Sequence, residues 1–145
     1  MPLLTFSTKK EELLNGTKIE TTRLYTERRW TELASANVEG KPLKCWWKPR
    51  TKEKEHLFDE VPRGVQIVAF IDENPEKKML WPYSCAMKSD GRIIPTRLTE
   101  DQVEEYVRNE GMDSLEEFVA VLEKMHGNLD AVPFIRIRFR DPKGA

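Results

Sequence analysis

Residues 5–23 read TFSTKKEELLNGTKIETTR. Thr8 and Glu11 have the spacing of a capping box, which predicts that a helix begins there. Asn15-Gly16 supplies the residue types that end helices in the left-handed conformation, so this helix is predicted to be short. The Thr-rich residues 17–23 then favour a strand whose charged and hydroxyl side chains lie beside a helix terminus. Taken alone, these residues also fit a half-exposed strand with solvated charges.

The length and charge of the chain fit one modest domain. With 145 residues, the chain can bury a core without disulfide bonds or metal ions to stabilise it, and we expect a single domain over residues 1–145. The formal net charge of −1 argues against a protein that coats nucleic acid non-specifically, because that mode of binding needs an excess of Lys and Arg. Basic residues outnumber acidic ones from Lys9 to Lys54, whereas Glu100 to Glu123 is acidic. One face is therefore predicted to attract phosphate.

The cysteines and histidines give no metal or redox motif. Cys45 and Cys85 stand alone in the sequence, so we expect reduced thiols. His56 and His126 do not have the spacing of zinc ligands, and we expect neither a metal nor another cofactor. The chain shows no secretory signal and no apolar segment of membrane-spanning length, which predicts a cytoplasmic protein without a membrane partner.

Strong strand and turn signals occupy the middle of the sequence. The segment from Val65 to Ile71 is β-branched, continuous and bounded by turn residues, so it is expected to be a central strand. The Asp-Gly turn within residues 89–92 predicts a tight hairpin. Pro82 and Pro95 lack a backbone donor, which predicts that the strands of this hairpin are edges or interrupted.

A helix pair and a closing strand are predicted after the hairpin. Thr99 and Ser114 can each cap a helix, and an apolar stripe follows each of them. The segment from Val132 to Phe139 alternates, so Arg136 and Arg138 are expected on one exposed face. Residues 24–42 show no regular helical or strand period.

Trp46, Trp47 and Arg50 form a second group of candidate binding residues. Aromatic side chains interleaved with cations are typical of surfaces that bind single-stranded nucleic acid, because bases stack on the rings and phosphates meet the cations. Strand alternation explains the two tryptophans equally well, with one packed inward and the other outward.

The first twenty-odd residues resemble the signature of ASCH domains. The matching features are an aromatic-Ser start, a helix ending in Leu-Leu-Asn-Gly, and a Gly-x-Lys-x-x-Thr-x-Arg pattern that begins at Gly16. ASCH domains belong to the PUA-like superfamily of small β-barrels associated with RNA. The resemblance implies an α+β fold, with a PUA-like β-barrel of about five to seven strands, a short N-terminal helix and a later helix pair. The middle region, residues 25–97, is longer here than in the compact members.

Within this family the chain resembles the branch of bacterial N4-acetylcytidine amidohydrolases, and the resemblance implies a catalytic set of Lys18, Thr21 and Glu110. Thr21 would be the nucleophile or would position a water, with Lys18 as base or as partner of an oxyanion. Glu110 would carry the proton to the leaving amine, or would activate the water. Arg23 and Tyr25 are candidates for holding the nucleobase or a phosphate.

One geometric condition and two alternative functions accompany this hypothesis. Lys18 and Thr21 are three positions apart, so in a regular strand their side chains point to opposite faces, unless a bulge intervenes or Lys18 belongs to the turn. The first alternative is a non-catalytic single-stranded RNA-binding module or a ribonuclease that uses the basic and Trp-rich segments. The second is an interaction domain with a vestigial cleft.

Overall fold

The computed structural model describes residues 3–6, 9–48 and 51–140, and this part of the chain contains eight strands and four helices. The strands are β1 (Leu3–Phe6), β2 (Glu20–Leu24), β3 (Leu43–Trp47), β4 (Glu55–Glu60), β5 (Gly64–Asp72), β6 (Leu80–Met87), β7 (Ile93–Arg97) and β8 (Pro133–Arg138). The helices are α1 (Lys10–Asn15), α2 (Glu27–Glu39), α3 (Glu100–Asn109) and α4 (Leu115–His126).

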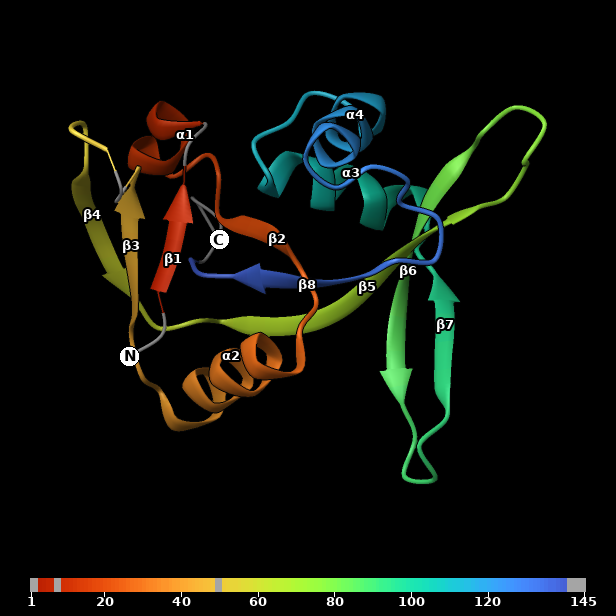
Figure 1. Ribbon diagram of the computed structural model, residues 1–145, viewed down its shortest axis with the longest axis horizontal. Coiled ribbons are helices and arrows are strands. Elements are labelled where there is room, and N and C mark those ends of the chain that lie inside the picture. The colour runs from red at the N-terminus through yellow and green to blue at the C-terminus, as the bar shows by residue number, and fades with distance from the viewer. Residues whose placement is uncertain (1–2, 7–8, 49–50, 141–145) are drawn as a thin grey trace.

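The strands form two sheets (Figure 1). A three-stranded sheet has the order β1-β3-β4, with β1 and β3 parallel. A five-stranded antiparallel sheet has the order β2-β8-β5-β6-β7, so β5 is central, as predicted. The α+β class is confirmed with more strands than expected, and the PUA-like barrel stays a prediction.

The ends of α1 are set by left-handed residues. Gly16 ends the helix with φ of 81°, as predicted. At the other end the N-cap position falls on Lys9, whose φ is 62° and whose side chain makes no capping hydrogen bond. The predicted cap, Thr8, lies outside the described residues.

The predicted helix pair is confirmed, whereas the segment without a regular period is a helix. Thr99 and Gln102 form a capping box at α3, and Ser114 caps α4. The helix that sequence reasoning missed is α2, which Thr26 caps by accepting from the Arg29 backbone N–H. Only Leu33 and Ala36 of α2 are buried, so its apolar stripe is too narrow to give a clear helical period.

The five-stranded sheet separates two hydrophobic cores. One core packs Phe70 and Phe134 against α3 and α4. The other packs Ile135 and Ile137 against α2 and the three-stranded sheet. Neighbouring residues of β8 thus enter opposite cores, which is the alternation expected of a strand buried on both faces. At the end of β8 away from Phe134, the sheet face that carries α3 becomes polar, and the candidate site lies there.

Pro82 corrects one strand prediction. It lies in β6, an interior strand between β5 and β7, although proline cannot donate to a ladder. Leu98 N–H donates to Pro82 O at 3.2 Å, but Pro82 has no N–H to return to the Leu98 carbonyl. The indole N–H of Trp81 takes that place and donates to Leu98 O at 2.7 Å. A neighbouring side chain therefore satisfies the acceptor that proline leaves open.

The variant Trp81→Phe is expected to destabilise the protein by about 1–3 kcal/mol, because the acceptor at Leu98 loses its donor while an aromatic ring is retained. Urea unfolding checks this. Trp46→Phe is the matched control, since the indole N–H of Trp46 has no hydrogen-bond partner within the described part of the chain and only a ring contact to His56 is recorded. Equal losses in the two variants would contradict the role of Trp81.

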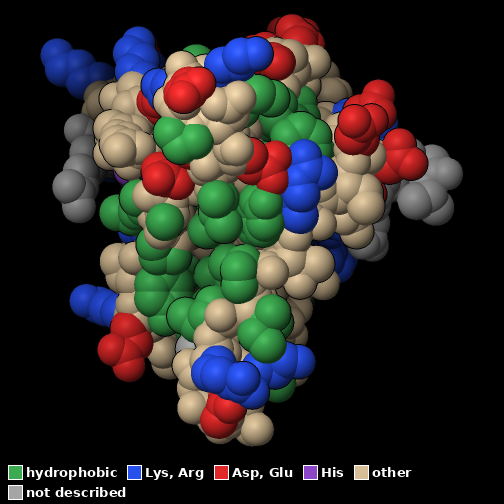
Figure 2. Space-filling view, turned by 90° about the vertical axis from the view of Figure 1, so that its right-hand side faces the viewer, with side chains coloured by type: hydrophobic (Ala, Val, Ile, Leu, Met, Phe, Trp, Pro, Cys, Tyr) green, Lys and Arg blue, Asp and Glu red, His purple; other side chains and the backbone are tan. Residues whose placement is uncertain are grey.

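Pro95 lies in β7 at the edge of the sheet, as predicted for a proline strand. The bonds from Leu98 N to Pro82 O and from Lys88 N to Arg92 O show that even-numbered residues of β7 bond to β6. The Pro95 nitrogen therefore faces the free edge, where its missing N–H discourages pairing with another strand. Hydrophobic side chains gather on the side of the molecule that β6 and β7 occupy (Figure 2), and Ile93 and Ile94 are exposed. None of the helices in the described ranges is long and apolar enough to cross a membrane.

Candidate functional site

The turn between α1 and β2 holds Lys18 against the end of α3. The Lys18 backbone N–H donates to Glu12 O at 2.9 Å, and the Ile19 N–H donates to Asn109 O at 2.8 Å. A Cβ added to Gly111, which has φ of +77°, would lie 3.3 Å from the Lys18 Cβ. Glycine at this position thus allows both the left-handed turn after α3 and the close approach of the lysine stem.

Lys18 and Glu110 form a buried ion pair. Lys18 Nζ donates to Glu110 Oε2 at 2.9 Å and to the Glu110 carbonyl oxygen at 2.9 Å. The exposed fractions are 5% for Lys18 and 2% for Glu110. These two predicted residues, 92 positions apart in sequence, are therefore brought together.

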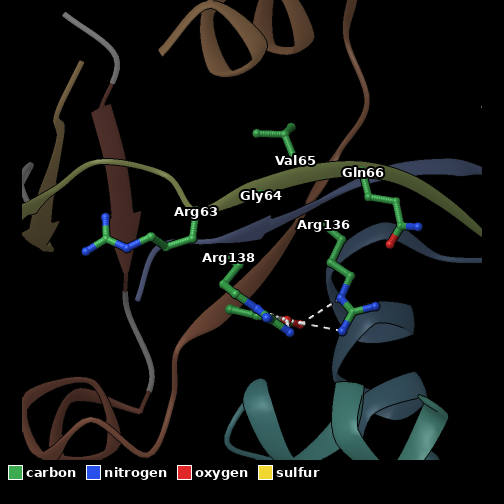
Figure 3. Close-up of a pocket in the computed structure, with 7 residues that line it drawn as sticks. Arg63, Gly64, Val65, Gln66, Arg136 and Arg138 are labelled. Carbon is green, nitrogen blue, oxygen red and sulfur yellow. Dashed lines mark hydrogen bonds and ion pairs between the residues drawn. The ribbon is translucent and has the colours of Figure 1, made fainter. Parts of the chain in front are cut away.

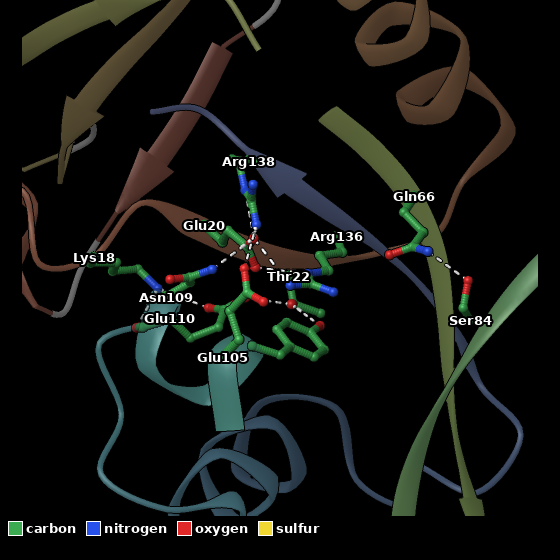
Figure 4. A network of polar contacts seen from close by, with 11 residues as sticks. Lys18, Glu20, Thr22, Gln66, Ser84, Glu105, Asn109, Glu110, Arg136 and Arg138 are labelled. Carbon is green, nitrogen blue, oxygen red and sulfur yellow. Dashed lines mark hydrogen bonds and ion pairs between the residues drawn. The ribbon is translucent and has the colours of Figure 1, made fainter. Parts of the chain in front are cut away.

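Thr22 contacts the same Glu110 carboxylate. Its Oγ1 donates to Glu110 Oε1 at 2.6 Å and lies 2.5 Å from Tyr106 OH. Because the one hydroxyl proton of Thr22 goes to the carboxylate, Tyr106 is the donor in the second contact. Complete burial, reinforced by the charge of Glu110, raises the pKa of Tyr106 well above its usual value, so the phenol keeps its proton. A directed chain of hydrogen bonds runs from Tyr106 through Thr22 to Glu110 (Figure 4).

Thr21, the predicted nucleophile, is not part of this network. In register, Thr21 lies opposite Ile137 and Thr22 lies opposite Arg136. Thr21 thus faces the core that contains Ile137, whereas Thr22 faces Glu110. Because β2 begins only at Glu20, Lys18 belongs to the turn, which is one of the two cases in which Lys18 and Thr21 could have met. The Lys18 ammonium nevertheless reaches Glu110 on the face of β2 that carries Thr22, so the structure does not bring Thr21 to Lys18 and Glu110. Thr22, the next residue, is the threonine that contacts Glu110.

Glu20 anchors a second cluster beside the first. Its carboxylate is 1% exposed and accepts from Asn109 Nδ2 at 3.2 Å, from Arg136 Nε and Nη2 at 2.7 and 3.1 Å, and from Arg138 Nε at 2.9 Å. Arg138 also donates to Glu105 at 3.2 Å. Asn109, which directly precedes Glu110, links the two clusters (Figure 4).

An open cleft, the arginine cleft, lies over Glu20 with a volume of about 230 Å³ (Figure 3). Its lining residues are Glu20, Arg63, Gly64, Val65, Gln66, Arg136 and Arg138. The Arg136 guanidinium stacks 4.1 Å from the centre of the Tyr106 ring. Burial opposes its charge, but hydrogen bonds and the charge of Glu20 outweigh burial and raise the pKa of Arg136. The cleft therefore presents the guanidinium groups of Arg136 and Arg138 beside Glu20, whereas Lys18, Thr22 and Glu110 are not among its lining residues.

The remaining predicted binding residues lie away from this cleft. Arg23 is on the Thr21 face of β2, where Nη2 donates to Thr5 O at 2.5 Å and the guanidinium lies 5.1 Å from the centre of the Phe6 ring. Tyr25 packs against the neighbouring core, with its ring 6.4 Å from that of Trp30.

The two predicted tryptophans belong to β3 of the three-stranded sheet. Trp46 lies against His56, with ring centres 5.1 Å apart. Trp47 is partly buried, and the ammonium groups of Lys10 and Lys48 lie 5.7 and 5.4 Å from its ring. Neither lines the arginine cleft. Arg50 lies outside the described residues.

Sequence reasoning missed the residues that orient Glu110. Tyr106 stands four positions before Glu110, so helical spacing places it on the same side of α3. Glu20 and Thr22 share one face of β2, opposite Arg138 and Arg136 of β8. The signal was present as alternate polar residues of matching charge in two strands, but it becomes readable only once the pairing of β2 with β8 is known.

No protein-family model, curated protein or solved structure matches this chain. Among the described residues, no group of three or more His, Cys, Asp and Glu side chains could hold a metal ion. Burial raises the pKa of the Cys45 thiol to about 12, so this cysteine stays protonated near neutral pH.

Proposed function

We propose that this chain recognises RNA or a modified nucleoside in the arginine cleft, and that Lys18, Thr22 and Glu110 hydrolyse an amide such as that of N4-acetylcytidine. The observation that carries the proposal is the Thr22 hydroxyl donating at 2.6 Å to a carboxylate whose other oxygen is held by Lys18 at 2.9 Å. The ASCH resemblance supplies the substrate class, with Thr22 in place of Thr21.

The chemistry needs only these side chains and a water molecule. Glu110 takes the Thr22 proton as Oγ1 attacks the amide carbonyl carbon, and it returns that proton to the amine nitrogen as the carbon–nitrogen bond breaks. Water then attacks the carbonyl carbon of the acyl-threonine and gives a proton to Glu110, which passes that proton to Thr22 Oγ1 as the carbon–oxygen bond breaks and acetic acid is released. Tyr106 and Lys18 fix the hydroxyl and the carboxylate, so little reorganisation is required as the charge moves.

Burial of the pair favours a chemical role over a purely stabilising one. A buried ion pair is often no more stabilising than apolar residues of the same volume, because desolvation cancels much of the attraction. Four polar side chains, those of Lys18, Thr22, Tyr106 and Glu110, nevertheless bond to one another at this place. Such a cluster of titratable groups beside a cleft is typical of functional sites.

The cleft supports a small polar ligand. Its volume of about 230 Å³ is below the range of drug-sized pockets, about 300–1,000 Å³, and suits a nucleobase or one nucleotide unit. Thr22 lies opposite the cleft residue Arg136 in register, so we expect a ligand held by Arg136 to approach the face of β2 that carries the hydroxyl. A stacking role for Trp47 has less support, because Lys10 and Lys48 already contact its ring.

The test is cytidine release from N4-acetylcytidine by the unmodified protein and by two isosteric variants, Thr22→Val and Thr21→Val. We expect Thr22→Val to abolish turnover and Thr21→Val to retain it, because only Thr22 contacts Glu110. Melting curves verify that both variants are folded. The reverse order of effects would refute the assignment of Thr22.

Absence of turnover in the unmodified protein would refute the hydrolysis. Titration of the protein with nucleosides and with short single-stranded RNA then tests recognition separately, using Arg136→Gln to remove a cleft guanidinium. Binding that Arg136→Gln leaves unchanged would refute the cleft as the recognition site.

A further inference from the structure

Arg23 is a half-buried cation with unused donors. Only Nη2 of its guanidinium has a hydrogen-bond partner among the described residues, the carbonyl oxygen of Thr5, and Nε is buried without one. The Phe6 ring covers the group on one side. Burial lowers the pKa of Arg23; the negative charge of Glu110 opposes this, and the positive charge of Arg29 adds to it. Both oxygens of Glu110 are already bonded to Lys18 and Thr22.

Arg29 is a second cation, exposed to solvent, whose positive charge acts on Arg23. It lies in the first turn of α2, and its Nη1 donates to the carbonyl oxygen of Leu24, the residue after Arg23. The recorded partners of both arginines are thus backbone carbonyls, and neither has a carboxylate partner in the described ranges. Apart from Arg108, an exposed residue of α3 without a carboxylate partner in the described ranges, the other described arginines behave differently. Those paired with a carboxylate are Arg28, Arg63, Arg92, Arg97, Arg136, Arg138 and Arg140.

The half-buried Arg23 guanidinium lacks a carboxylate partner and is repelled by the charge of Arg29, which is costly in the absence of a bound anion. Desolvation penalises a buried cation that lacks a counter-charge, and like charges at close range add to the penalty. Guanidinium groups donate in a planar fork that matches the oxygens of phosphate. Thr5 O, Leu24 O and the Phe6 ring hold the two side chains in place, so a ligand need not order them.

We propose that Arg23 and Arg29 form a phosphate-binding site at the junction of β2 and α2. The site lies on the face of β2 opposite to Thr22 and Glu110, and it does not depend on the proposed function. Its ligand is a phosphate group, either free or carried by a nucleotide.

Calorimetric titration at low salt tests this with inorganic phosphate, cytidine 5′-monophosphate, cytidine and acetate. We expect saturable binding of the two phosphates, and no binding of cytidine or acetate at this site. Arg29→Gln should weaken phosphate binding at least about tenfold, since it removes one charge-assisted donor group. Arg28→Gln is the matched control, because Arg28 is the adjacent residue and pairs with Glu32. It should leave phosphate binding unchanged.

Arg23→Lys is the second variant, because it retains the charge but lacks the buried Nε donor, and it should also weaken binding. Arg29 is exposed, so Arg29→Gln gives a result even if changes at Arg23 impair folding. Tighter binding of the nucleotide than of phosphate would assign the source as a nucleotide, whereas equal affinities would assign free phosphate, and both support the site. Equal phosphate affinity in the unmodified protein and in Arg29→Gln, acetate binding as tight as phosphate binding, or no saturable binding would overturn it.

Discussion

Glu110→Ala is expected to destabilise the protein by about 3–5 kcal/mol, because it leaves the Lys18 ammonium buried without its counter-charge. Lys18 is 5% exposed, so water cannot replace the lost carboxylate without opening the contact between the α1–β2 turn and α3. Thr22 loses its acceptor in the same variant. Urea unfolding monitored by circular dichroism measures the loss.

The double variant Lys18→Met with Glu110→Leu distinguishes two contributions to stability: the cost of leaving Lys18 buried without a counter-charge, and the stabilisation that the ion pair itself provides. Apolar residues of similar size remove both charges at once, and we expect the double variant to be more stable than Glu110→Ala. A double variant as unstable as the single one would contradict this account, since it would show that packing and not charge causes the loss.

Glu20→Ala is expected to have the next largest effect, a loss of about 3 kcal/mol in the free energy of unfolding. The variant leaves Arg136 without its counter-charge and Asn109 without its acceptor. The loss should be smaller than for Glu110→Ala, since Arg138 is partly exposed and keeps Glu105. Glu105→Gln is the control. It removes the more exposed partner of Arg138 and should cost less than about 1 kcal/mol.

A second readout distinguishes Glu20 from a merely structural residue. Its removal raises the positive charge of the arginine cleft, so anionic ligands should bind more tightly at low salt. Glu20→Gln keeps the shape and removes the charge, and it should show the same gain with a smaller loss of stability. Unchanged anion affinity in Glu20→Gln would contradict an electrostatic role for this carboxylate.

Local signals in the sequence predicted the elements with strong periodicity. The central position of β5, the hairpin at residues 89–92 and the capped pair α3 and α4 follow from branched residues, an Asp-Gly turn and capping residues. The sequence carries no comparable signal for the helix α2, because this helix buries little apolar surface. Pro82 misled the strand prediction because a side chain, the Trp81 indole, replaced the missing backbone donor.

The candidate site was predictable only in part. The family resemblance named Lys18 and Glu110, which the structure brings together. It also named Thr21, and here a shift of one residue decides which face of a strand is used. The Glu20 cluster depends on the pairing of β2 with β8, a contact between segments more than a hundred residues apart that no local pattern specifies.

The separation of Lys18 from Glu110 also has a consequence for how the protein folds. The contact between Lys18 and Glu110 closes a loop that contains α2, α3 and the strands β2 to β7. Closing so long a loop has a high entropic cost. During synthesis the lysine emerges long before its partner and remains hydrated until α3 docks. We therefore expect the ion pair to form late in folding, after the segments that carry Lys18 and Glu110 have come together.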